Sequence, residues 1–325
     1  MVPLVFRKAH MDFYQEAETM NLRSQAIRLP GFSPEKRKTI MKKNLVAYSF
    51  IAPNFIGFAI FTLGPIIFAF ILAFLNWDGS NAMTFAGFSN FVRLLSDERF
   101  LIALKNTIIY TVATVPLTMV TALFLAVLLN KKVRGRNFFR TVSFFPYVAS
   151  LVAVTVVWNM MFLPGRGPIN NVLTLLGVSN PPGWATSKDW AMVSVIMFSI
   201  WKNMGYYMII YLAGLQGMDP QLYEASSLDG ANPWQKFRYV TLPQLRPTNF
   251  FVLIMLTIAC FKVYDIVYML TLGGPGTSTL VLVYHIYNTA FISWDLGYAS
   301  AIAMVLFLLV LIVTLVQMRG ERRMK

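Results

Sequence analysis

Glu224–Pro243, EASSLDGANPWQKFRYVTLP, is a polar segment between two long apolar ones. Just before it, Asp219-Pro220 is typical of a capped helix with proline in its first turn. We therefore expect a short helix over Gln221–Leu228. Gly230 then supplies a turn. A second short helix is expected after Asn232-Pro233, so the segment reads as a helix-turn-helix lying along a membrane face.

The composition is that of an integral membrane protein. The chain has 325 residues, of which 57% are apolar and 13% charged, with a mean hydropathy of +0.58. A soluble core of this size cannot bury so much apolar surface. A membrane span needs about 20 mostly apolar residues. Six segments qualify: Val46–Leu75, Thr107–Leu129, Thr141–Leu163, Trp190–Leu212, Pro247–Thr271 and Ala299–Val316.

The polar segment resembles the EAA loop of ABC importer permeases. That family's pattern is matched at Glu224, Ala225, Gly230, Val240, Leu242 and Pro243. Ser226 departs from it, as a small residue in place of alanine. From about residue 44 the chain is similar to the sugar branch of these permeases, including Leu272-Gly273-Gly274-Pro275 after the fifth span. The resemblance implies an all-α membrane fold of the type I ABC importer kind, with six transmembrane helices and a cytoplasmic coupling helix.

Lysine and arginine indicate the orientation, because cytoplasmic loops carry their excess. Most of the 28 lie before the first span, between the second and third, in the loop 219–243, or in the tail. We therefore expect the EAA loop and both termini to be cytoplasmic, in a bacterial or archaeal inner membrane. The chain divides into a cytoplasmic segment (1–44), a six-span domain (45–317) and a cytoplasmic tail (318–325). The placement of these residues on cytoplasmic segments, next to anionic lipid headgroups, explains the net charge of +14. Binding to nucleic acid is therefore not expected.

Three segments outside the spans have their own patterns. Residues 1–40 mix charged and aromatic residues without a signal-peptide core, which predicts an N-terminal amphipathic segment or, equally, a poorly ordered tail. Ser33-Pro34 predicts the start of the helix that enters the first span. The connector Asn76–Asn106 is expected to form a short helical excursion, that is, a short helix outside the membrane before the second span. Ile169–Gly177 is apolar but too short to span, so an interfacial helix is expected there.

The resemblance implies that the first helix of the loop docks in a groove on a separate ATPase subunit. The implied coupling residues are Glu224, Ala225, Ser226, Leu228, Asp229 and Gly230. Glu224 would hold the docked helix through hydrogen bonds or a basic partner; the alternative is a solvated loop glutamate. The sequence has no Gly-x-x-x-x-Gly-Lys-Ser/Thr motif, so we expect no catalytic residue and assign ATP and Mg to partner subunits. His10 and His285 are too far apart to form a metal pair, and no metal site is predicted.

Charged side chains inside the predicted spans mark a candidate substrate path. Lys202, Lys262 and Asp265 would be costly there unless paired or facing water. Lys262 and Asp265 are three residues apart, so on one helix they would share a face and could simply pair. A sugar needs hydrogen bonds for its hydroxyls and aromatic faces for its rings. The neighbouring residues that fit are Asn203, Tyr206, Tyr264 and Tyr268, although helix packing alone would also explain the tyrosines.

Sequence and resemblance together predict a permease subunit of an ATP-driven importer for an oligosaccharide. The implied partners are a second, similar permease, two ATPase subunits and an extracytoplasmic binding protein. The two lysines would also tolerate an acidic sugar, such as a uronate oligosaccharide, or a phosphorylated one. The rival class is an ion-coupled secondary transporter using Lys262 and Asp265, which leaves the EAA loop unexplained. A non-transporting membrane scaffold is the third class.

Overall fold

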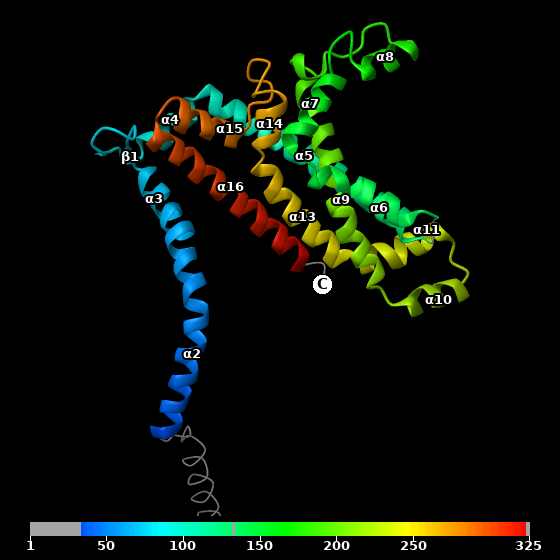
Figure 1. The fold of residues 1–325 in the computed structure, drawn as a ribbon, viewed down its shortest axis with the longest axis horizontal. Helices are drawn as coiled ribbons and strands as arrows, with labels where there is room; N and C mark the ends of the chain where they lie inside the picture. The colour runs from blue at the N-terminus through cyan, green and yellow to red at the C-terminus, as the bar shows by residue number, and fades with distance from the viewer. Residues whose placement is uncertain (1–33, 132–133, 323–325) are drawn as a thin grey trace, which may run out of the picture. The chain divides into compact units, whose positions relative to one another are not determined.

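The computed structural model describes residues 34–131 and 134–322 (Figure 1), so residues 1–33 of the predicted N-terminal segment lie outside the described part. The chain divides into two compact units, Met1–Ile67 and Phe68–Lys325. Within the described residues, four helical stretches are long and apolar enough to cross a membrane: Lys43–Leu72, Glu98–Asn130, Ala191–Gln216 and Leu296–Glu321. Two bent helix pairs bring the candidate spans to 6 when each pair counts as one, in agreement with the predicted number.

The described part of the first unit is a continuous run of helix. It comprises α2 (Pro34–Phe58), a π-helical turn η1 (Ala59–Leu63) and the start of α3 (Gly64–Leu72). The helix begins at Pro34 as predicted, because the fixed φ of proline suits a first turn. Beyond residue 44 its side chains are nearly all apolar and mostly exposed, as at Phe50, 82% exposed. Such an all-round apolar surface is that of a lipid-facing span.

The second unit has a small hairpin at one end. Strands β1 (Leu75–Asn76) and β2 (Thr84–Phe85) pair antiparallel and precede α4 (Ser89–Ser96). Asn90 on α4 is buried and donates through Nδ2 to the backbone carbonyls of Ala73 and Leu75, at 3.1 and 3.0 Å. Helix α4 confirms the predicted excursion; the strands were not predicted.

Three long helices form most of the core of the second unit: α5 (Glu98–Asn130), α9 (Ala191–Gln216) and α13 (Arg246–Phe261). Helix α5 starts at the N-cap Asp97, whose carboxylate accepts from the backbone N–H groups of Arg99 and Phe100 at 2.8 and 3.3 Å. Small residues recur at helical spacing on the buried face of α5, where they let neighbouring backbones approach closely. They are Ala103, Thr107, Thr111, Thr114, Thr118, Ala122 and Ala126.

The predicted third span is not a straight helix. It is made of α6 (Arg136–Val148) and α7 (Leu151–Met161), which meet at 98°. Pro146 weakens the last turn of α6, and Ala149 and Ser150 leave the helical region with ψ of 145° and 123°. The segment expected to be an interfacial helix forms α8 (Pro168–Leu175), followed by a 3-10 turn η2 (Trp184–Thr186), which confirms the short helix, while its interfacial position stays a prediction.

The remaining elements place the EAA segment and the predicted fifth span. The EAA segment forms α10 (Pro220–Leu228), α11 (Pro233–Lys236), a π-helical turn η3 (Phe237–Thr241) and α12 (Leu242–Gln244). After α13 come α14 (Asp265–Leu270), α15 (Leu282–Tyr287), a π-helical turn η4 (Asn288–Ile292) and α16 (Leu296–Arg322). Figure 1 shows α10 and α11, here called the EAA end, at the opposite end of this unit from α4, α14 and α15, here called the hairpin end.

Candidate functional site

Helix α10 is positioned by caps at both of its ends. At its start the Asp219 carboxylate accepts from the backbone N–H of Gln221 at 2.9 Å, and proline occupies the first turn. At its end Gly230 has φ +75°, the left-handed region that glycine enters without strain. The backbone N–H of Ala231 donates to the carbonyl of Ser226 at 3.0 Å, and that of Gly230 to Ser227 at 3.2 Å. This pattern is a Schellman cap, so the predicted helix and turn are confirmed.

Tyr223 fastens α10 to the rest of the EAA segment. Its hydroxyl lies 2.8 Å from the Thr241 hydroxyl and 3.2 Å from the Met218 sulfur. Lys236 adds a second link by donating to the Ser227 hydroxyl at 2.7 Å. The sequence analysis missed Tyr223, since only the fold reveals that η3 returns beside α10. These two contacts join α10 to η3 and to α11.

The outward surface of the EAA segment is free to meet another protein. Glu224 is exposed, and no described residue forms a hydrogen bond or ion pair with its carboxylate. Large apolar side chains are also exposed on the EAA segment: Leu228 on α10 at 90%, Tyr239 on η3 at 73% and Trp234 on α11 at 69%. The predicted coupling residues all lie on α10 or its cap, and none is buried. An unpartnered carboxylate on α10 and exposed apolar side chains on α10, α11 and η3 are features typical of a docking surface.

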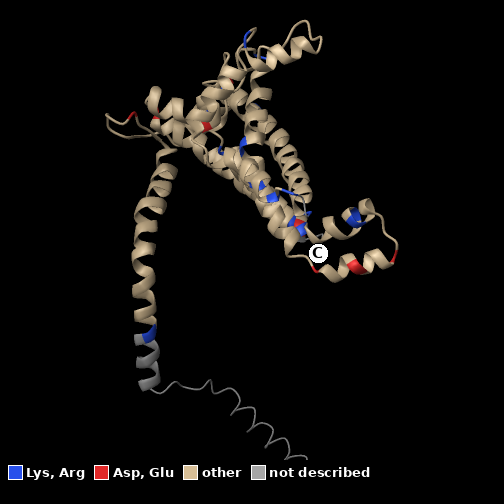
Figure 2. Ribbon diagram, turned by 45° about the vertical axis from the view of Figure 1, so that its right-hand side comes forward, with Lys and Arg blue, Asp and Glu red and all other residues tan. Residues whose placement is uncertain are grey.

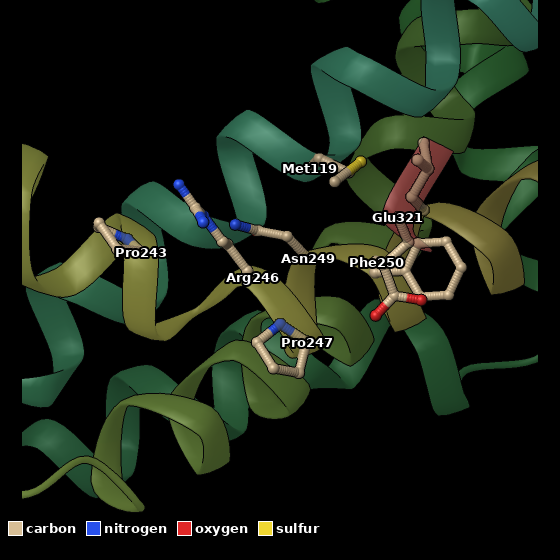
Figure 3. Close-up of a pocket in the computed structure, with 8 residues that line it drawn as sticks. Met119, Pro243, Arg246, Pro247, Asn249, Phe250 and Glu321 are labelled. Carbon is tan, nitrogen blue, oxygen red and sulfur yellow. The ribbon is translucent and has the colours of Figure 1, made fainter. Parts of the chain in front are cut away.

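A cavity of about 480 Å³ lies beside the end of the EAA segment (Figure 3). Its lining comes from α5, α12, the start of α13 and the end of α16: Met119, Pro243, Arg246, Pro247, Asn249, Phe250, Leu253 and Glu321. None of the predicted substrate-path residues lines it.

The side chain of Lys202 forms hydrogen bonds with the backbone of the same unit. Its ammonium donates to the backbone carbonyls of Pro146, Tyr147 and Ala149, at 3.1, 3.5 and 3.4 Å. These carbonyls lie at the C-terminal end of α6, where helical partners are missing. A cation also suits the negative end of a helix. Lys202 thus stabilises the 98° bend between α6 and α7, and its ammonium is already engaged.

The neighbours predicted with Lys202 also have contacts inside the unit. Asn203 donates through Nδ2 to the backbone carbonyl of Ser199 at 2.8 Å. The Tyr206 ring stacks on Tyr147, with 4.5 Å between centroids and 16° between planes. Both residues remain half-buried. The Tyr206–Tyr147 pair exposes part of its surface beside the bend.

Of the two alternatives for Lys262 and Asp265, pairing on one helix face is wrong. Helix α13 ends at Phe261, Tyr264 takes φ −140° and ψ −59°, and a new helix starts at Asp265. The two residues therefore do not share a helix face. Both are exposed, and among the described residues no ion pair joins them. An ion relay built on this pair has no support from the structure.

Tyr264 and Tyr268 meet two further tyrosines that the sequence analysis did not select. The rings of Tyr264 and Tyr268 stack at 5.5 Å and 19°. Tyr287 lies 5.2 Å from Tyr264, and Tyr284 lies 6.1 Å from both Tyr264 and Tyr268. The last two stand on α15, in a segment whose aromatic content was visible in the sequence. No ring contact or hydrogen bond in the described part joins this cluster to Tyr206 and Tyr147.

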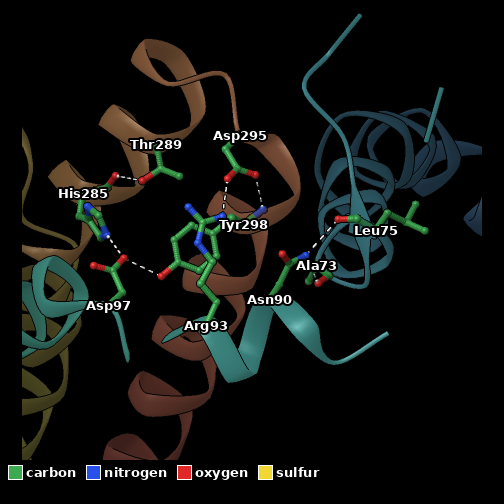
Figure 4. A network of polar contacts seen from close by, with 9 residues as sticks. All are labelled: Ala73, Leu75, Asn90, Arg93, Asp97, His285, Thr289, Asp295 and Tyr298. Atoms are coloured by element: carbon green, nitrogen blue, oxygen red, sulfur yellow. Dashed lines mark hydrogen bonds and ion pairs between the residues drawn. The ribbon is translucent and has the colours of Figure 1, made fainter. Parts of the chain in front are cut away.

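A polar network holds the hairpin end together (Figure 4). The Tyr298 hydroxyl donates to the Asp97 carboxylate at 2.6 Å, and His285 Nε2 lies 3.4 Å from the same carboxylate. Arg93 pairs with Asp295 at 2.7 Å and stacks over the Tyr298 ring at 3.9 Å. These residues line a cavity of about 380 Å³. The network, here called the clasp, ties α4 and the start of α5 to α15 and α16.

Burial and hydrogen bonding shift the pKa values of the clasp. Desolvation lowers the pKa of His285 and outweighs the attraction of Asp97, which raises it. For Asp97, desolvation alone would raise the pKa. Hydrogen bonds from Tyr298 and from the backbone N–H groups of Phe100 and Arg99, with the charge of His285, hold the pKa of Asp97 below its usual value.

The family is evident from comparison with known proteins. Residues 115–325 match the model of the family described as "Binding-protein-dependent transport system inner membrane component". The chain belongs to this family and is a permease of an ABC transporter. It is 38% identical to the lactose transport system permease protein LacF of Rhizobium radiobacter, over 85% of this chain and 94% of that protein. It is 33% identical to the sn-glycerol-3-phosphate transport system permease protein UgpA of Agrobacterium fabrum, over 87% and 97%.

Solved structures agree with this assignment. A chain of a bacterial alginate ABC transporter, in complex with its alginate pentasaccharide-bound periplasmic protein, superposes with a TM-score of 0.77 at 26% identity. The match covers 88% of this chain and 97% of that one. The predicted type I importer fold is confirmed, and a secondary transporter is not favoured.

Proposed function

We propose that this chain forms part of the translocation path of an ATP-driven importer for an oligosaccharide and couples that path to separate ATPase subunits. The observation that carries the proposal is the exposed, doubly capped α10 with its unpartnered Glu224. The substrate class is supported by relatives of this chain, which include a permease of a lactose transport system and a probable permease for starch degradation products. The alginate-carrying structural neighbour adds support for an acidic oligosaccharide.

The EAA end faces the cytoplasm in this proposal. Figure 2 shows lysine and arginine on the EAA segment and on the ends of α6, α13 and α16 near it. This distribution is typical of a cytoplasmic face. Both termini lie on that side, and the hairpin end meets the extracytoplasmic binding protein.

Coupling runs through α10. Two ATPase subunits, which bind ATP and Mg, close around the EAA helices of this chain and of a second, similar permease. Glu224, Ala225, Ser226, Leu228 and Asp229 make the contact, and Gly230 sets the direction of the chain after it. The links from Tyr223 to Thr241 and from Lys236 to Ser227 carry the movement to α13. A rigid shift of packed helices then reorients the path.

The substrate path is proposed for Asn203, Tyr206, Lys262, Tyr264, Asp265 and Tyr268. Lys202 lies beside it and maintains the bend. Because the Lys202 ammonium is engaged with three carbonyls, Lys262 is the cation on this list that is placed to meet an acidic sugar.

Reconstitution of the complete importer tests the proposal. The chain is purified with its co-assembled subunits, placed in proteoliposomes, and assayed for uptake of labelled lactose and of alginate oligosaccharides. We expect uptake only with ATP, Mg and binding protein present, accompanied by sugar-stimulated ATP hydrolysis. Uptake by this chain alone, driven by an ion gradient without ATP, would overturn the proposal.

A further inference from the structure

Four tyrosines form one connected aromatic surface at the hairpin end. Tyr264 and Tyr268 flank the start of α14, and Tyr284 and Tyr287 lie one turn apart on α15. Beyond the contacts given above, Tyr287 lies 6.1 Å from Tyr268 and 5.4 Å from Phe291. The four residues, here called the tyrosine cluster, come from two segments that are separated by the glycine-rich loop 272–279.

That loop is shaped to place the Tyr284 ring. Gly273 has φ +79°, and a Cβ at this position would stand 2.6 Å from Tyr284 Cε1. The loop is fastened by Thr279, whose hydroxyl lies 2.7 Å from the Thr271 hydroxyl and 2.9 Å from the Gly274 carbonyl. The Leu272-Gly273-Gly274-Pro275 motif therefore acquires a physical role. It leaves room for an aromatic ring against the backbone.

The tyrosine cluster has the features of a surface that meets a ligand. All four side chains are only half-buried. Their hydroxyls have no hydrogen-bond partner outside the cluster among the described residues. By contrast, Tyr211, which packs in the core of the second unit, is fully buried, at 0% exposed.

The chemistry favours a sugar ring over a phosphate. Ring faces attract the C–H face of a pyranose, and phenols exchange hydrogen bonds with its hydroxyls. Lys262 and Asp265 beside the cluster are exposed and of opposite charge. A phosphate would require convergent cations instead, and Lys262 is the only lysine or arginine on the described segment 262–291.

We infer that Tyr284 and Tyr287 complete, with Tyr264 and Tyr268, a stacking subsite for a pyranose ring at the hairpin end of the path. The subsite rests on the proposed function and refines it, because it requires a ring-containing substrate. It makes Tyr284 and Tyr287 determinants of specificity.

Uptake by the complete importer tests the subsite. Tyr284→Leu and Tyr287→Leu keep apolar volume and remove the ring, whereas Tyr284→Phe and Tyr287→Phe keep the ring. At saturating binding protein and lactose or alginate oligosaccharide, the Leu variants should lose about two- to tenfold in uptake rate. The Phe variants should stay close to wild type. Tyr48→Leu, at an exposed tyrosine in the first unit, is the matched control and should leave uptake unchanged.

Thiol labelling provides an independent readout. The sole native cysteine, Cys260, is buried, so background labelling by a maleimide is low. Tyr287→Cys should react with the maleimide, and the transported sugar should slow this reaction at least about twofold. Met269→Cys, at an exposed position of α14, is the control and should react at a rate that sugar does not change. The subsite is overturned if the wild-type importer takes up sugar, the Leu and Phe variants take it up at equal rates, and sugar does not slow the maleimide labelling of Tyr287→Cys. If the wild type imports no sugar, it is the proposed function that fails.

Discussion

Replacing Lys202 by methionine distinguishes two roles for this residue, stabilisation of the fold and binding of the substrate. Methionine keeps the length and the apolar stem but donates no hydrogen bond. The contact to the Pro146 carbonyl at 3.1 Å is of ordinary length, whereas those at 3.4 and 3.5 Å are weaker. A hydrogen bond from a charged donor contributes about 1.5–3 kcal/mol, and removal of a half-buried charge returns part of its desolvation cost.

The net loss expected for Lys202→Met is therefore about 1–2 kcal/mol. At about 2–4 °C per kcal/mol, the melting midpoint of the purified complex should fall by roughly 2–8 °C. Thermal unfolding in detergent, followed by tryptophan fluorescence, measures it. Lys262→Met is the matched control, because Lys262 is exposed without a described partner; its midpoint should not move. An unchanged midpoint for Lys202→Met, together with altered sugar selectivity, would refute the structural role.

Two further predictions concern the clasp and the EAA segment. Burial lowers the pKa of His285 below its usual 6.5, so the unfolded chain takes up a proton more readily than the folded chain does. The free energy of unfolding should therefore fall as the pH drops through 6.5. The lowered pKa of Asp97 adds a further loss of stability at more acidic pH. Melting midpoints from pH 8 to pH 5 should show this slope for wild type and a smaller one for His285→Gln, and a slope that rises toward acid would contradict it. Tyr223→Phe removes the 2.8 Å bond to Thr241 and should cost about 1 kcal/mol. It should also reduce uptake per ATP hydrolysed, whereas an unchanged ratio would show that the link carries no movement.

Much of the fold could be predicted from local signals. Asp219-Pro220 and Gly230 determine the two ends of α10 through caps that involve only neighbouring residues, so spacing alone was sufficient. The six apolar segments were likewise evident, because span length follows from membrane thickness. The bends within the third and fifth spans were not evident from the sequence, because the apolar content of a segment does not indicate the direction of its helices. Lys202, which donates to backbone carbonyls at the 98° turn after Val148, is distant in sequence, so no local pattern indicates this contact.

One expectation failed because it assumed a regular helix. Lys262 and Asp265 would share a face only if α13 continued, and it ends at Phe261. The tyrosine cluster was half predicted, because Tyr264 and Tyr268 lie in an apolar span where phenols are conspicuous. Tyr284 and Tyr287 join them through a loop closed by long-range packing, which no periodicity reveals.

The most direct test of the account is uptake by the reconstituted importer carrying Glu224→Ala. Loss of a charge-assisted contact worth about 1.5–3 kcal/mol should reduce sugar uptake by at least about tenfold, while the chain still inserts and the ATPase subunits still hydrolyse ATP. Glu98→Ala, at an exposed glutamate in the first turn of α5, should leave uptake unchanged. Sugar uptake by Glu224→Ala equal to that of Glu98→Ala and wild type would contradict the claim that this chain couples transport through α10.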